Sequence, residues 1–83
     1  MYKRQVLARY VEELQGYLHR QAALPAEWVS AATISDAVLH LTSDQLAQLR
    51  AELHALAERW AAQSDPGAPG AEDVTLIYQA FRR

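Results

Sequence analysis

The sequence predicts an α+β domain in which two long amphipathic helices pack on a small two-stranded sheet, in the order helix, strand, helix, strand. Three observations carry this prediction. The apolar content of 51% is rich in alanine and leucine, which favours helix. Two segments repeat apolar residues at spacings of three and four, and two others are rich in β-branched and aromatic residues. We expect residues 1–83 to form a single domain whose sheet is completed by dimerisation, because two strands alone are marginally stable in water.

The first expected element is a helix over residues 1–24, which Pro25 ends or closely follows. Gly16 interrupts it, either as a tolerated surface glycine or as a point where another backbone approaches closely. The helix spans ~33 Å, about as far as a compact domain of this size is wide (roughly 30 Å). Part of its apolar stripe is therefore expected to pack against a second subunit. The stripe consists of Val6, Leu7, Tyr10, Val11, Leu14, Tyr17 and Leu18.

The second expected element is a strand over residues 31–41, AATISDAVLHL, which contains β-branched and apolar residues and neither proline nor glycine. Alternation places Ile34, Asp36, Val38 and His40 on one face. Both faces are mixed, so the pattern does not say which face is buried. Helix is the competing interpretation of this segment.

The third expected element is a helix over residues 43–62. Thr42 and Gln45 have the spacing of a capping box. The apolar residues that follow are spaced three and four apart, as in helices that pack side by side at a shallow angle. They are Leu46, Leu49, Leu53, Leu56 and Trp60.

The chain then carries a flexible surface loop and a closing strand. Residues 63–73 contain two prolines and two glycines, which predict the loop. Residues 74–81, VTLIYQAF, are β-branched and aromatic and predict the strand. If the two strands are neighbours, we expect them to be parallel with a right-handed crossover.

Charge and composition exclude several classes of function. The net charge of -2 and pI near 5.8 disfavour independent DNA or RNA binding, which usually needs a basic surface. No apolar run approaches ~18 residues, so no membrane span is expected. The absence of cysteine excludes disulfides and thiolate metal sites and fits a cytoplasmic location. A small domain without disulfides or metal sites often gains stability by oligomerisation, and we expect a homodimer.

No pattern in the sequence predicts catalysis, a metal site or a cofactor. The three histidines have no ligand spacing, and no glycine-rich phosphate loop precedes a helix. Asp36 and His40 lie four residues apart on one predicted strand face, where they either face solvent or polarise a pocket. The pocket hypothesis groups these two residues with four aromatic side chains, as in sites for small apolar or aromatic ligands. Its residues are Trp28, Asp36, His40, Trp60, Tyr78 and Phe81.

The dimer hypothesis uses the apolar positions of both predicted helices. Its interface residues are Leu7, Tyr10, Leu14, Tyr17, Leu18, Leu49, Leu53 and Leu56.

The run VLHLTSDQLAQLRAELHAL from Val38 to Leu56, followed by Trp60, a proline- and glycine-rich loop and VTLIYQAF, resembles the C-terminal region of ArsR-like winged-helix transcriptional regulators. The matching residues are Leu41, Thr42, Leu46, Leu49, Leu53, Leu56, Ala80 and Phe81. The winged helix itself has no counterpart in these residues. The resemblance implies a cytosolic homodimer that contacts DNA only through a winged-helix domain.

We therefore expect a homodimerisation module of a transcriptional regulator that also senses a small molecule. The alternatives are a stand-alone small-molecule-binding dimer and a small enzyme with an interface site built on Asp36 and His40.

Overall fold

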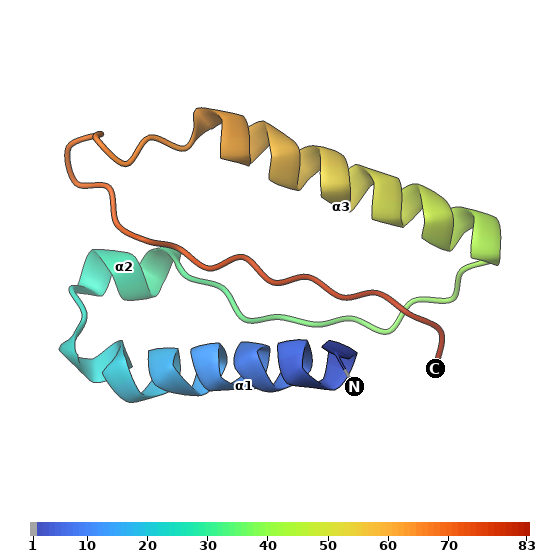
Figure 1. The fold of residues 1–83 in the computed structure, drawn as a ribbon, viewed down its shortest axis with the longest axis horizontal. Helices are drawn as coiled ribbons and strands as arrows, with labels where there is room; N and C mark the ends of the chain where they lie inside the picture. Colours follow the sequence, from blue (N-terminus) through green and yellow to red (C-terminus); the bar gives the residue numbers. More distant parts are fainter. Residues whose placement is uncertain (1) are drawn as a thin grey trace. The chain divides into compact units, whose positions relative to one another are not determined.

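The computed structural model describes residues 2–83 and contains three α-helices and one short 3-10 helix (Figure 1). In chain order these are α1 (Tyr2–Arg20), η1 (Gln21–Ala23), α2 (Ala26–Ala31) and α3 (Ser43–Gln63). The chain divides into an N-terminal unit, Met1–Ala37, and a C-terminal unit, Val38–Arg83.

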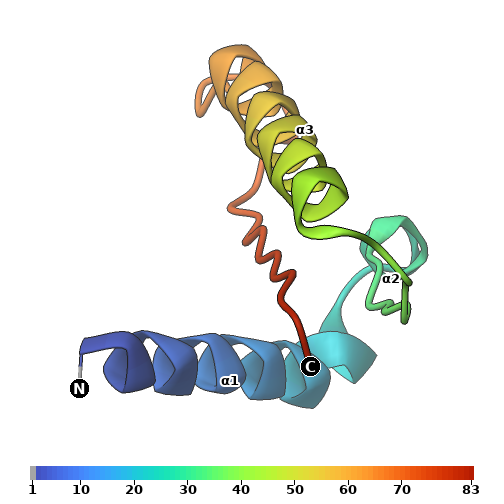
Figure 2. The ribbon, with the colours of Figure 1, turned by 90° about the vertical axis from the view of Figure 1, so that its right-hand side faces the viewer.

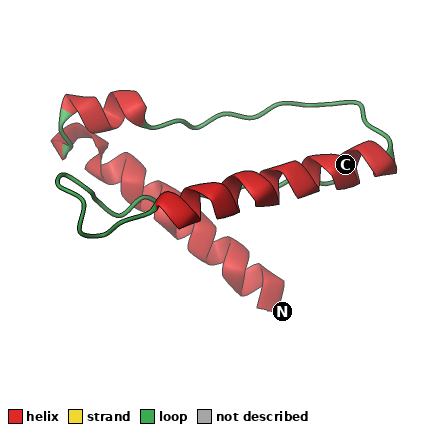
Figure 3. Cartoon of the chain, turned by 90° about the horizontal axis from the view of Figure 1, so that it is seen from above, coloured by secondary structure: helices red, strands yellow, loops and turns green. Residues whose placement is uncertain are grey.

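The predicted α+β fold class is wrong, because the described residues are all-α and contain no strand (Figure 3). In the first predicted strand, 31–41, Ala31 is the last residue of α2 and the rest is loop, so the competing helix is also wrong. The second predicted strand, 74–81, is loop throughout. The expected pair of parallel strands with a right-handed crossover is therefore wrong as well. The reason is that a strand forms only where a neighbouring strand completes its hydrogen bonds. The β-branched residues on which the prediction depended show only a side-chain preference for strands.

The N-terminal unit bends sharply after α1. The α-helix stops at Arg20, four residues before the end of the predicted helix, and η1 follows it. Leu24 is extended with ψ 149°, as expected for a residue that precedes proline. Pro25 then caps α2. Figure 2 shows α1 and the short helix that follows this bend. Most of the half-buried residues of this unit lie at the bend, among them Tyr17, Leu24, Trp28 and Val29.

The C-terminal unit begins with the capping box that the sequence predicts, and this prediction is confirmed. The Thr42 hydroxyl accepts a bond from the Gln45 N–H at 3.1 Å, and the Gln45 side chain accepts from the Thr42 N–H at 2.9 Å. Asp44 lies in the first turn, where its charge complements the helix dipole. Together these groups satisfy donors that a helix start would otherwise leave unpaired.

Two successive turns follow α3. The Asp65 carboxylate accepts from the Gly67 N–H at 2.9 Å. The Asp65 and Ala68 carbonyls accept from the N–H groups of Ala68 and Ala71, at 3.1 Å and 3.0 Å. Gly70 has φ 81°, the value that a type II turn requires at its third position. These turns reverse the chain, and residues 71–83 (the C-terminal segment) run back along α3 (Figures 1 and 3).

None of residues 4–83, for which burial is described, is buried in either unit, and these residues therefore form no hydrophobic core. The most covered side chains of α3 are only half-buried: Leu46, Leu49, Leu53 and Ala57.

Candidate interaction surface

One face of α1 is an exposed apolar stripe. We define the α1 stripe as Leu7, Tyr10, Val11, Leu14 and Leu18, which are between 39% and 54% exposed. The four aliphatic members follow one another at intervals of four, three and four residues, which keeps them on one side of a helix. A stripe this exposed is suited to pack against another apolar surface.

The opposite face of α1 is charged. A shallow open hollow on it is lined by Arg9, Glu12, Glu13 and Arg20. The Arg20 side chain lies over Gly16, where a Cβ would be 2.8 Å from the guanidinium Nη1. The close neighbour of Gly16 is thus the mobile end of a side chain rather than a backbone, which supports the surface-glycine interpretation. This polar face is unsuited to apolar packing, so the exposed apolar side chains of α1 gather on the α1 stripe.

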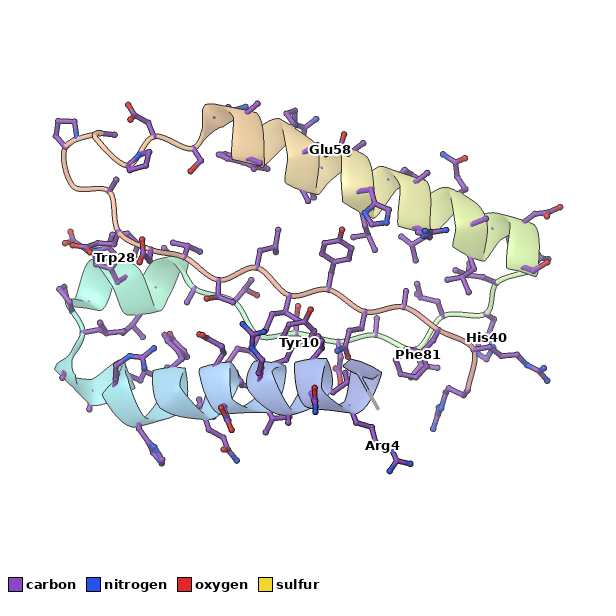
Figure 4. The ribbon with its side chains drawn as sticks, viewed as in Figure 1. Arg4, Tyr10, Trp28, His40, Glu58 and Phe81 are labelled. Carbon is purple, nitrogen blue, oxygen red and sulfur yellow. The ribbon has the colours of Figure 1, made fainter. Side chains whose placement is uncertain are left out.

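The second set of predicted interface residues lies on α3. Leu49 and Leu53 are half-buried, whereas Leu56 is 42% exposed and Trp60 is 59% exposed. Glu58 points away from the C-terminal segment (Figure 4). The leucine-rich face of α3 is thus partly covered within its own unit.

A side-chain contact between the C-terminal segment and α3 joins Tyr78 and His54. The Tyr78 hydroxyl oxygen is 2.7 Å from His54 Nδ1. The rings meet edge to face, with centroids 5.7 Å apart and planes at 78°. With the ring proton on Nε2, the hydroxyl donates and Nδ1 accepts. Sequence reasoning placed Tyr78 in a pocket and missed His54, because no local spacing links residues that only a chain reversal brings together.

The six predicted pocket residues are not gathered in an enclosed site within either unit. Trp28 and Asp36 belong to the N-terminal unit, and the other four belong to the C-terminal unit. Asp36 and His40 are exposed. In the C-terminal unit, Phe81 is 73% exposed, and Figure 4 shows the His40 side chain projecting away from the ribbon. A small apolar ligand would find little of the enclosure that such ligands need.

Residues 2–83 lack two other features, a cluster of metal ligands and a helix that could cross a membrane. No group of three or more potential metal ligands occurs within this range. None of the helices in this range has the length and apolar character needed to cross a membrane.

Comparisons with protein-family models, with curated proteins and with solved structures each gave no match.

Proposed function

We propose that this chain is a homodimerisation module, and that the dimer serves a transcriptional regulator of the ArsR-like type. The observation that carries the proposal is the exposed α1 stripe in a chain without a buried residue among those described. The resemblance of residues 38–81 to the C-terminal region of such regulators supplies the context. DNA contact by this chain itself forms no part of the proposal, because its net charge is -2.

The accessible surface supports association. A folded monomer of 9.3 kDa has an accessible surface of roughly 5,000 Å², whereas this chain exposes 8098 Å², an excess of about 3,100 Å². Packing between parts of one chain buries about 600–1,500 Å², so it could cover half of this excess surface at most. Obligate homodimer interfaces bury about 2,000–5,000 Å², which is the scale of surface that needs covering.

The energy of this burial indicates the concentration range of the equilibrium. Full burial of a leucine or valine side chain contributes about 1.5–3 kcal/mol, so covering a half-exposed one contributes about 1 kcal/mol. Eight such side chains, four aliphatic ones from each α1 stripe, give about 8 kcal/mol of burial energy before the cost of association. With an association cost of about 4 kcal/mol, the low end of the range, about 4 kcal/mol remains, which corresponds to a Kd near 1 mM. Burial of the α3 leucines would lower this Kd.

Sedimentation velocity over a dilution series from about 1 mM to about 1 μM, which runs from this Kd downward, tests the proposal. We expect a dimer that dissociates on dilution. Leu14→Glu places a charge in the middle of the α1 stripe and should shift the equilibrium to monomer. Leu39→Glu is the matched control, because Leu39 is 59% exposed in a loop and should leave the dimer intact.

Two results would contradict the proposal. A wild-type chain that is monomeric and fully helical at every concentration shows that no second copy is needed. Equal dissociation of both variants shows that added charge, rather than loss of the stripe, separates the subunits.

The pocket residues favour no second function. Trp60 and Phe81 are more than half exposed, which leaves little enclosure for a ligand around these two side chains.

A further inference from the structure

We infer that the α1 stripe pairs with the α1 stripe of a second copy in antiparallel orientation, with a two-fold axis between residues 12 and 13. This inference rests on the proposed function and goes beyond it, since association by itself fixes neither the helix nor its direction.

The stripe has the spacing of a short two-helix seam. Leu7, Val11, Leu14 and Leu18 occupy alternate d and a positions of a heptad repeat. The intervals of four, three and four read the same in both directions. An antiparallel partner therefore places Leu7 opposite Leu18 and Val11 opposite Leu14, and every central layer remains aliphatic.

The central layers alone do not select a direction, because a parallel pair would also be aliphatic. The end layers do. One heptad step before Val11 stands Arg4, and one step after Leu14 stands Gln21, the first residue of η1, which follows the end of α1 directly. A parallel pair places Arg4 directly opposite Arg4 of the second copy, and like charges facing each other are unfavourable. An antiparallel pair places Arg4 opposite Gln21, which removes this repulsion and offers an amide oxygen to the guanidinium.

The helix dipoles favour the same direction. The first turn of α1 contains no acidic residue, so nothing there offsets the partial positive charge of the helix N-terminus. Parallel pairing would bring two such ends together, whereas antiparallel pairing brings each to a C-terminal end of opposite partial charge.

The flanks of the stripe are also consistent with an antiparallel pair. Ala8 and Gln15 line one flank, where the alanine allows close approach of the helices. Tyr10, the aromatic member of the stripe, lies with Tyr17 on the other side of its four aliphatic residues. Reversal brings Tyr10 of one copy near Tyr17 of the second, within range of a favourable aromatic pair.

Disulfide trapping tests the direction. The chain has no cysteine, so any disulfide that forms joins two introduced cysteines. Arg4→Cys and Gln21→Cys variants, one carrying a longer tag, are oxidised separately and as a mixture. Positions 4 and 21 are about 25 Å apart along a helix, far beyond the Cα separation of about 7 Å that a disulfide can span. Arg9→Cys, on the polar face, is the control.

We expect the mixture to yield a linked heterodimer, whereas each single variant and the Arg9→Cys control stay unlinked. Efficient self-linking of Arg4→Cys indicates parallel helices and overturns the inference. A dimer by sedimentation that links in no combination places the interface elsewhere, which overturns the inference but leaves the proposed function standing. A monomer by sedimentation overturns the proposed function, and the inference with it.

Discussion

At the scale of single residues, the contact between Tyr78 and His54 joins the C-terminal segment to α3. The hydroxyl lies 2.7 Å from Nδ1, and both residues are exposed. A hydrogen bond between neutral groups contributes about 0.5–1.5 kcal/mol net, and exposure to water places this one toward the lower end. Its role is therefore local: it holds the C-terminal segment on α3 rather than stabilising the chain as a whole.

Tyr78→Phe should release the C-terminal segment from α3 without unfolding the helix. We expect faster amide exchange over residues 72–83 and a shifted NMR resonance of the His54 ring, with a loss of about 0.5–1 kcal/mol in stability. Tyr17→Phe, which removes a hydroxyl from α1 in the other unit, is the matched control. An unchanged His54 resonance together with unchanged exchange in Tyr78→Phe would show that the hydroxyl does not hold the segment.

At the scale of elements, α3 is specified by its own sequence. The reciprocal bonds between Thr42 and Gln45 close the helix start, and Asp44 adds a favourable charge. These groups are local, so the start of the helix does not depend on packing against a distant segment.

Thr42→Ala should destabilise the start of α3 by about 1 kcal/mol. It removes the oxygen that accepts from the Gln45 N–H and leaves that donor to water. Urea unfolding at fixed protein concentration, followed by circular dichroism, measures the loss. Thr42→Ser keeps the cap and should retain the wild-type midpoint, and Ser43→Ala changes a neighbouring position outside the box. If all three variants unfold together with the wild type, the capping box contributes nothing to stability.

The difference between local and long-range interactions explains which elements could be predicted from sequence. Helix α3 and its capping box depend on bonds between residues three or four apart, which spacing reveals. The strands predicted over 31–41 and 74–81 depend on a neighbour to complete their ladder, and spacing says nothing about a neighbour. The apolar stripe of α1 was likewise visible as a periodicity, but the contact of His54 with Tyr78 needed the turns at Asp65 and Gly70 to be known.

At the scale of the whole molecule, stability and association cannot be separated. Hydrophobic burial is the main favourable term in folding, and no described residue is buried. A chain that leaves its apolar side chains in water gains little to offset the conformational entropy lost on folding, which is roughly 1–2 kcal/mol per residue for the backbone alone. A second copy that covers these side chains supplies the missing burial, so folding should be linked to concentration.

The thermal midpoint should therefore rise with protein concentration. Linked folding and dimerisation add about 1.4 kcal/mol per tenfold increase in concentration, which for a dimer of this size raises the Tm by roughly 3–6 °C. Circular dichroism melts over the dilution range of the sedimentation series measure this slope. Leu14→Glu should melt at a lower temperature that does not vary with concentration, and Leu39→Glu should retain the wild-type slope. A wild-type Tm that is high and constant over the whole range would show that one copy hides its apolar surface by itself, and the dimerisation module would then lose its physical basis.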